Sequence, residues 1–232
     1  MQRYAGKPGL VIAMDGPAGS GKSTAARRVA AELSLRYLDT GAMYRALTWW
    51  LRERGIDLTD TAAVLARIAE PHIAISTDPA APWITVDGQD VAGPIRTREV
   101  SNTVSIVAAI PEVRAMLIAM QRGIIAEAAA RPGIVAEGRD IGTVVAPDAA
   151  IKVYLTASED VRAQRRSADL AADPAASVEA TKREQARRDQ RDAAQSVMAD
   201  DAVHVDTSLL GLDEVVGLVI GLARARQAVS RG

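Results

Sequence analysis

Residues 16 to 23 have the types and the spacing of a phosphate-binding loop. The pattern G-x-x-x-x-G-K-S/T is matched by Gly16, Pro17, Ala18, Gly19, Ser20, Gly21, Lys22 and Ser23. Glycines let successive backbone N–H groups converge on phosphate oxygens, and the dipole of a following helix favours the negative charge. We expect Lys22 to bridge the β- and γ-phosphates and Ser23 to ligate Mg²⁺. The loop therefore predicts binding of a nucleoside triphosphate.

The segments around the loop supply the context that it requires. Leu10–Asp15 is an apolar run typical of a buried strand, and a helix is predicted over residues 21–33. A short strand over residues 37–38 and a helix over residues 42–54 follow. A strand, a helix and a strand in this order indicate a parallel α/β sheet.

The rest of the chain extends this pattern after one interruption. Short strands are predicted over residues 73–76 and 83–86, and Asp87-Gly88 is a turn signal, so residues 58–98 form a small antiparallel insert. Further strands are predicted over residues 133–136, 151–155 and 203–206. Helices are predicted over Pro111–Ala130, after Ser158, over residues 177–194 and over residues 212–228, with a break at Asp173-Pro174.

The composition excludes several classes of protein. The 232 residues, 48% hydrophobic and 25% charged, have ordinary globular composition and suffice for one large domain with a subdomain insert. Cysteine is absent, which excludes a disulfide scaffold and a cysteine-ligated metal. The formal net charge is −1, and no apolar run approaches the roughly 20 residues of a membrane helix. We expect a cytoplasmic protein that binds neither membrane nor nucleic acid.

A phosphate loop alone does not separate kinases, GTPases and motor ATPases. The Asn-Lys-x-Asp guanine reader of GTPases is absent, because the single asparagine, Asn102, precedes Thr103. Glu137 or Asp140 could serve as the acid of a motor's second motif, but the chain is short for a motor. A small kinase is the best remaining class.

Arginines gather in three places that bear on the second substrate. The helix after Ser158 carries Arg162, Arg165 and Arg166, and the next helix carries Arg183, Arg187, Arg188 and Arg191 beside Asp189 and Asp192. Arg139-Asp140 follows a strand's carboxyl end, where open α/β sheets bind ligands. Alone, each helical cluster fits a solvated, salt-bridged face. With the phosphate loop, the two helices fit a mobile lid over a phosphoryl-transfer site.

The same arginines bear on the chemical class of the acceptor. A kinase that phosphorylates an alcohol needs a carboxylate base, whereas a phosphate acceptor already carries anionic oxygens. Holding two anions together requires cations, and this chain has more arginines than candidate bases. The balance favours a phosphate acceptor.

The sequence resembles the bacterial cytidylate kinases of the nucleoside monophosphate kinase group, from about Leu10 to about Ala228. The resemblance is carried by residues 16–24, 38–45, 95–100, 113–114, 137–145 and 147–149. The strings Asp-Thr-Gly-Ala-Met-Tyr-Arg (39–45) and Gly-Arg-Asp-Ile-Gly-Thr-Val-Val (138–145) are the most specific. The resemblance implies a three-layer α/β/α phosphate-loop core with a parallel sheet, an NMP-binding insert and a helical lid. The core would comprise residues 1–57 and 99–232, with the insert at 58–98 and the lid at about 158–192.

The resemblance implies transfer of the γ-phosphoryl group of ATP to CMP or dCMP, with Mg²⁺, by a monomer in pyrimidine nucleotide metabolism. The donor would be held by Gly16, Pro17, Ala18, Gly19, Ser20, Gly21, Lys22, Ser23 and Thr24, with Ser23 on the metal. The acceptor would be contacted by Thr40, Tyr44, Arg45, Ser105, Arg114, Arg139, Asp140, Arg188 and Asp192. Transfer itself would be assisted by Lys22, Arg162, Arg165, Arg166 and Arg188.

Within the acceptor set, the resemblance implies separate duties. Arg45 and Arg139 would hold the CMP phosphate, and the positions of Arg188 and Asp192 contact the sugar. The cytosine would be read by Ser105, Arg114 and Asp140. A carboxylate can accept from the N4 amino group of cytosine, whereas uracil presents O4 there and would be repelled.

One position departs from the family pattern. The family commonly continues Arg-Asp-x-x-Asp-Ser-x-Arg, and Gln195 stands here in place of the last arginine. An amide can still hydrogen-bond but brings no charge, so the preference between ribose and deoxyribose stays open. UMP, AMP or shikimate remain alternative acceptors. A nucleotide-dependent regulatory or nucleic-acid-binding module is disfavoured, because the net charge is near zero and no basic, aromatic-interleaved stripe is present.

Overall fold

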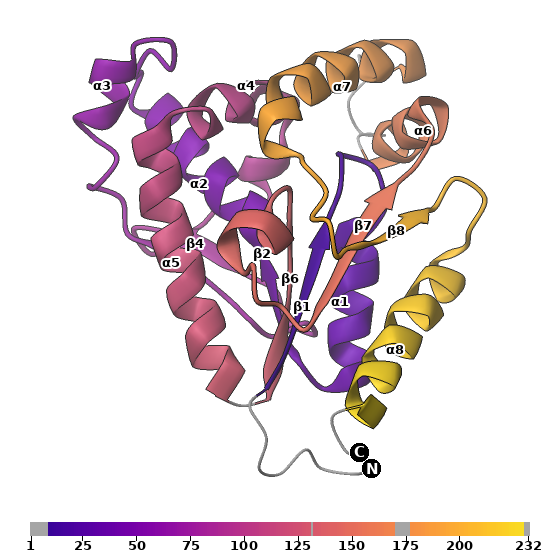
Figure 1. Ribbon diagram of the computed structural model, residues 1–232. Helices are drawn as coiled ribbons and strands as arrows, with labels where there is room; N and C mark the ends of the chain where they lie inside the picture. Colours follow the sequence, from indigo (N-terminus) through magenta and orange to yellow (C-terminus); the bar gives the residue numbers. More distant parts are fainter. Residues whose placement is uncertain (1–8, 131, 170–176, 230–232) are drawn as a thin grey trace.

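A five-stranded parallel sheet forms the centre of the computed structural model, which describes residues 9–130, 132–169 and 177–229 (Figure 1). The strand order is β2-β6-β1-β7-β8, and every pairing is parallel. The strands are β1 (Leu10–Asp15), β2 (Arg36–Asp39), β6 (Gly133–Gly138), β7 (Ile151–Thr156) and β8 (Val203–Asp206). The predicted α/β class with a parallel sheet is therefore confirmed.

Helices cover both faces of the sheet and give three layers (Figure 1). One face packs against α1 (Lys22–Leu33) and α8 (Leu212–Val229). The other packs against α2 (Thr40–Glu53) and α5 (Pro111–Ala130), and α4 (Arg98–Ala108) packs on these two helices. Side chains of β1 alternate between the layers, since Ile12 and Met14 join the first cluster and Ala13 the second.

The insert forms a second, antiparallel sheet of three short strands. Its elements are α3 (Thr61–Leu65), β3 (Ile73–Ile75), β4 (Ile84–Val86), β5 (Gln89–Asp90) and the 3₁₀ turn η1 (Pro94–Arg96). The turn predicted at Asp87-Gly88 joins β4 to β5, and both residues have positive φ, 52° and 80°. The division of the chain at residues 57 and 98 stays a prediction.

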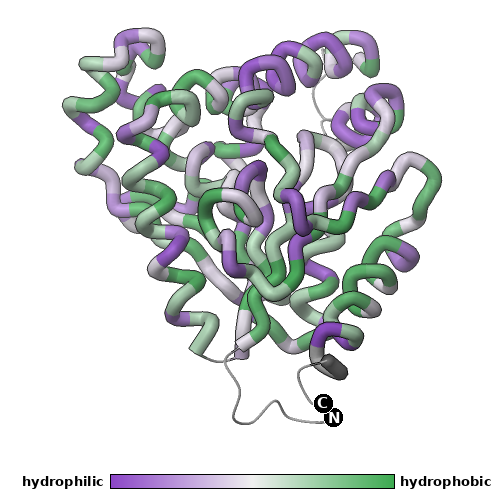
Figure 2. The backbone as a smooth tube through the Cα atoms, in the orientation of Figure 1, coloured by the Kyte–Doolittle hydropathy of each residue, from purple (hydrophilic) through white to green (hydrophobic). Residues whose placement is uncertain are grey.

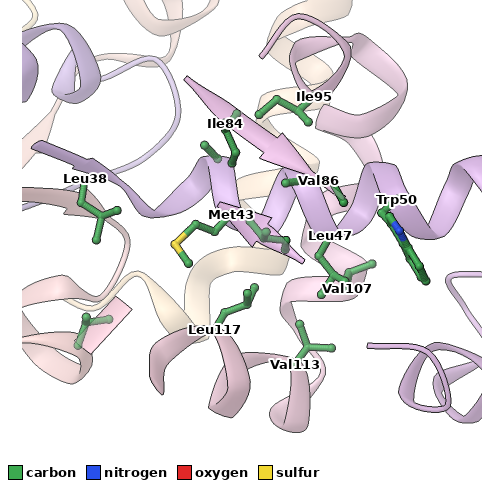
Figure 3. Close-up of a cluster of buried hydrophobic side chains, with 14 of the residues drawn as sticks. Leu38, Met43, Leu47, Trp50, Ile84, Val86, Ile95, Val107, Val113 and Leu117 are labelled. Carbon is green, nitrogen blue, oxygen red and sulfur yellow. The ribbon is translucent and has the colours of Figure 1, made fainter. Parts of the chain in front are cut away.

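Helix α2 lies between the insert and α5, and its apolar face organises the larger core. Met43 and Leu47 are fully buried, and Trp50 is nearly so (Figure 3). They share one hydrophobic cluster with insert, sheet and helix side chains, among them Leu38, Ile84, Val86, Ile95, Val107, Val113 and Leu117. The insert is thus packed through the same core as α2.

Three parts of the structure differ from the sequence prediction or extend it. Helix α4 was not predicted, although Val100, Val104 and Val107 are buried at helical spacing. Helix α2 begins two residues earlier than predicted, because the Asp39 side chain accepts a hydrogen bond from the Ala42 N–H at 2.8 Å. A π-helical turn, η2 (Ile141–Val145), follows β6. The predicted break at Asp173-Pro174 lies outside the described residues.

The two lid helices of the prediction are present as α6 (Glu159–Asp169) and α7 (Val178–Asp192), followed by the short turn η3 (Ala193–Gln195). They lie beside each other above the carboxyl end of the sheet (Figure 1). Much of α7 is hydrophilic (Figure 2).

Across the described parts of the chain, no single helix is long and apolar enough to cross a bilayer. Helices α4 and α5 reach that length and hydropathy only as a pair, and they are bent by 101°.

The shared core predicts a large stability cost for truncation at its centre. Leu117 is fully buried in the cluster around α2, so Leu117→Ala is expected to lower the free energy of unfolding by about 3 kcal/mol. Leu209 is 96% exposed, and Leu209→Ala should change it by less than about 0.5 kcal/mol. Urea unfolding measures both, and equal losses in the two variants would contradict the packing described.

Candidate active site

A cleft of about 800 Å³ opens at the carboxyl edge of the parallel sheet and is strongly cationic. Its lining comes from the phosphate loop, the ends of β2 and β6, the segment after β6, helices α2 and α4, the start of α5, the lid helices with the turn η3, and the start of α8. Eight cationic side chains line it, namely Lys22, Arg45, Arg96, Arg114, Arg139, Arg165, Arg166 and Arg188. Only four carboxylates do so, Asp39, Glu137, Asp140 and Asp192, in a chain of net charge −1. Such an excess of cations suits a ligand with several negative charges.

The phosphate loop forms as its glycines predict. Gly16, Gly19 and Gly21 have φ of 147°, 79° and 86°, values that side-chain-bearing residues rarely adopt. A Cβ at Gly16 would also lie 2.1 Å from the Leu155 carbonyl oxygen. The Lys22 ammonium donates to the Pro17 carbonyl at 3.2 Å. Burial and the nearby Arg139 lower the pKa of Lys22 to about 8, so an anion in the loop would restore a charge that the site now disfavours.

Oxygen atoms that could bind a metal lie near the start of α1. Glu137, near the end of β6, is 2% exposed and accepts a hydrogen bond from the Tyr37 hydroxyl at 2.9 Å. Burial and the neighbouring Asp39 raise the pKa of Glu137, whereas Lys22 and a hydrogen bond from Ser23 lower it. The carboxylate thus lies beside the two loop side chains expected to face phosphate and metal.

These oxygen atoms fit the chemistry of Mg²⁺. Magnesium prefers hard oxygen ligands and usually takes one or two from protein, with substrate phosphates and waters completing its shell. Within the described ranges, no group of three or more His, Cys, Asp or Glu side chains is placed to hold a metal alone. The Ser23 hydroxyl and the adjacent Glu137 carboxylate match that partial shell. The sequence alone suggests Glu137 only as a motor-type acid, although its place at a strand's carboxyl end is a usable signal for a metal ligand.

The residues predicted to hold an acceptor phosphate lie near the phosphate loop. Arg45 donates to Asp39 at 3.0 Å, and Arg139 donates to the Gly16 carbonyl at 2.5 Å. Asp192 accepts two hydrogen bonds from Arg139, at 3.0 and 3.2 Å, and lies 3.6 Å from Arg188. Burial and Arg139 lower the pKa of Arg188 to about 9. The carboxylates hold these guanidinium groups in position beside the phosphate loop.

The predicted base-reading residues form a second group in the cleft. Arg114 forms an ion pair with Asp140, and its other terminal nitrogen donates to the Gln195 side-chain oxygen at 3.3 Å. An arginine at position 195 could not accept that bond, so the departure from the family pattern coincides with a different partner for Arg114. Ser105 and Tyr44 also line this part, and burial raises the pKa of Tyr44 to about 12.

Several polar atoms of the cleft are buried without a hydrogen bond. Ser20 Oγ, Arg45 Nε, Ser105 Oγ and Arg188 Nε have no such partner within the described part of the chain. Most buried polar atoms in proteins are hydrogen-bonded, so a cluster of exceptions calls for a specific explanation. All four belong to residues that line the cleft, which indicates a polar ligand.

The lid arginines divide into two kinds. Arg165 donates to the Thr207 hydroxyl and carbonyl oxygens at 3.0 and 2.9 Å, and Arg166 donates to Ser101 Oγ at 2.7 Å. Both line the cleft. Arg162 is 7% exposed and is not part of the lining; its guanidinium group contacts Asp189 and the Ala18 carbonyl oxygen. In this structure it ties the lid to the phosphate loop.

Most of the other predicted residues also come together in this cleft. Residues 18–24 of the loop, Thr40, Tyr44 and Asp192 line it. Gly16 and Pro17 are not part of the lining, and their carbonyl oxygens accept hydrogen bonds from Arg139 and Lys22. The prediction missed Asp39, Arg96 and Ser101. The spacing of Arg96 within the family-like segment 95–100 was an available signal, whereas nothing in the sequence pointed to Ser101 once α4 was overlooked.

Comparison with known proteins agrees with this geometry. The family model described as cytidylate kinase matches residues 12–225. A cytidylate kinase of Streptomyces avermitilis is 50% identical over 225 residues, and that of Streptomyces coelicolor is 52% identical over 225 residues; each alignment covers 95% of both chains. The cytidylate kinase of Rhodococcus jostii is 49% identical, covering 91% of this chain and 93% of the relative. With a family match over most of its length, the chain belongs to the cytidylate kinase family.

Proposed function

We propose that the chain transfers the γ-phosphoryl group of ATP to CMP, giving ADP and CDP, with dCMP as a second acceptor. One observation carries the proposal: a phosphate loop and a second cluster of arginines line the same cleft, and an arginine–carboxylate pair lies beside that cluster. The phosphate loop suits a triphosphate, and the arginine cluster suits a monophosphate. The arginine–carboxylate pair suits a base that carries both hydrogen-bond donors and acceptors. Membership of the cytidylate kinase family supports this reading.

The donor side needs binding and charge neutralisation rather than covalent chemistry. The loop N–H groups would hold the phosphates of ATP, and Lys22 would neutralise the β- and γ-phosphates. Ser23 and Glu137 would hold Mg²⁺, which supplies further positive charge toward the transferring group. A phosphate acceptor brings its own anionic oxygen, so the chain needs no general base.

The acceptor side exchanges internal ion pairs for substrate contacts. Arg45 donates to Asp39, and Arg139 donates to Asp192. With CMP bound, both would direct some of their N–H groups to its phosphate. Asp140 would accept from the cytosine amino group while Arg114 donates to the ring acceptors. Arg188 and Asp192 would contact the sugar. Among the described residues, Arg45 Nε and Arg188 Nε have no hydrogen-bond partner, which supports these roles.

The lid would complete the site. Arg165 and Arg166 line the cleft from α6 and would face the phosphates, which spreads the charge of the transferring group over several cations. Arg162 would act through the lid's attachment to the loop. Covering the site would exclude water and so suppress hydrolysis of ATP. The monomeric state and the cytoplasmic location stay predictions from the sequence.

Acceptor-dependent release of ADP tests the proposed function. We expect CMP and dCMP, each supplied with ATP and Mg²⁺, to stimulate ADP release strongly, and UMP and AMP to do so weakly, because Asp140 repels the O4 of uracil. A coupled ADP assay gives the kcat/KM for each acceptor. Stimulation by AMP or UMP equal to that by CMP would contradict the assigned base, and no stimulation by any of the four would refute the proposal.

The base-reading role of Asp140 predicts a loss specific to cytosine. Asp140→Asn keeps the shape but presents a donor as well as an acceptor, so kcat/KM for CMP should fall about 10- to 100-fold. The ratio of CMP to UMP turnover should fall with it. The exposed Asp148 lies in the following loop, and Asp148→Asn should change neither value. An unchanged CMP-to-UMP ratio in Asp140→Asn would count against this role.

The position of Glu137 predicts an altered requirement for Mg²⁺. Chelation of the metal should abolish turnover, and added Mg²⁺ should restore it. Glu137→Gln removes the charge next to Ser23, so half-maximal activity should need about tenfold more Mg²⁺. Glu112→Gln, on the exposed start of α5, is the matched control. Identical Mg²⁺ titrations for Glu137→Gln and the wild type would show that Glu137 does not serve the metal.

A further inference from the structure

Asp15 carries a buried carboxylate for which the proposed reaction has no direct use. It is the last residue of β1 and is 5% exposed. Its two oxygens accept hydrogen bonds from consecutive backbone N–H groups, Oδ1 from Ile141 and Oδ2 from Gly142, both at 2.8 Å. It does not line the cleft.

The two hydrogen bonds fix one end of the segment that carries the acceptor-site residues. Its other end is held where Gly138 pairs with Asp15 in the β1–β6 ladder. Only Arg139 and Asp140 lie between these two attachments. The backbone that presents both side chains to the cleft is therefore held on either side by the same residue of β1.

Asp15 also connects this segment to the phosphate loop. Gly16, the first residue of the loop, follows Asp15 directly, and the Gly16 carbonyl accepts a hydrogen bond from Arg139 at 2.5 Å. The distance between the ATP side and the monophosphate side of the cleft thus depends on this junction. In it, the Asp15 carboxylate oxygens accept the hydrogen bonds. In phosphoryl transfer, misplacing the reactants by about 1 Å costs on the order of 100-fold in rate.

The junction needs a carboxylate in particular. Two adjacent N–H donors require two acceptors, whereas an asparagine would offer one acceptor and turn an NH₂ group toward the second N–H. Burial raises the pKa of Asp15 to about 6, although the Gly142 and Ile141 N–H groups and Lys22 oppose that rise and Asp140 adds to it. An acid is thus retained at a site that disfavours its charge.

We infer that Asp15 is a positioning residue that sets the acceptor-reading segment, Arg139 and Asp140, against the phosphate loop. It governs affinity for the monophosphate and selection of its base more than it governs affinity for ATP. This inference rests on the proposed function, because the roles of Arg139 and Asp140 are taken from it.

Steady-state kinetics of Asp15→Asn tests the inference with ATP–Mg²⁺ and with CMP or UMP as acceptor. The KM for CMP should rise about tenfold or more, and the ratio of kcat/KM for CMP to that for UMP should fall, because the reading segment is displaced. The KM for ATP should change less than twofold. A general loss of structure would not produce this split between the two substrates.

Asp87→Asn is the matched control. Asp87 also accepts a backbone N–H, that of His72, and the Trp50 indole N–H, each at 2.8 Å, but it lies outside the cleft. Its substitution should leave both KM values unchanged. If Asp15→Asn does not fold, Asp15→Glu decides, since it keeps both acceptor oxygens but places them one methylene further from β1, against the Ile141 and Gly142 N–H groups. It should raise the KM for CMP in the same direction by a smaller factor.

The outcomes separate the inference from the function beneath it. Absence of CMP-dependent ADP release by the wild type overturns the proposed function, and with it the inference. Wild-type turnover together with unchanged CMP kinetics in folded Asp15→Asn overturns the role of Asp15 alone. So does an equal rise in the KM for CMP and for ATP, or an equal rise in Asp87→Asn.

Discussion

Mutual repulsion among the cations of the cleft is the constraint on which the rest of the structure depends. Eight lysine and arginine side chains face one volume of about 800 Å³, and burial makes their charges harder to solvate. Three of the four carboxylates of the cleft offset part of this repulsion, since Asp39 lies beside Arg45, Asp140 beside Arg114 and Asp192 beside Arg139. Burial, and after it the nearby Arg139, lowers the pKa of both Lys22 and Arg188, so both charges remain unfavourable in the cleft. Two nucleotides carrying several negative charges would offset the remaining repulsion.

The fold brings these charges together by means that are not themselves electrostatic. Parallel strands end at one edge of the sheet, so β1, β2 and β6 deliver the phosphate loop, Asp39 and the Arg139 segment to the same place. The apolar alternation along β1 fixes which faces the flanking helices cover. Buried hydrophobic area thus holds in place a polar arrangement that would be unfavourable by itself.

Local signals made much of this predictable from the sequence. The phosphate loop, the strands around it and the turn at Asp87-Gly88 depend on short-range rules for glycine, apolar runs and helix ends. The partners of each arginine did not follow from such rules. That Arg162 contacts Ala18 and Asp189 while Arg165 contacts Thr207 depends on how α6 packs, which no spacing in the sequence specifies. The role of Asp15 could not be predicted from the sequence, because its partners are backbone N–H groups 126 and 127 residues away.

The common core of α2 and the insert has a mechanical consequence. Side chains of β4 and η1 interlock with Met43, Leu47 and Trp50, and the Trp50 indole is further bonded to Asp87 and stacked under Arg54 at 3.7 Å. Rotating the insert away from α2 would open a cavity in close-packed apolar surface, which proteins resist. We therefore expect helix α2 and the insert to move together as one unit. Any hinge of this unit would then lie outside α2 rather than at residue 58.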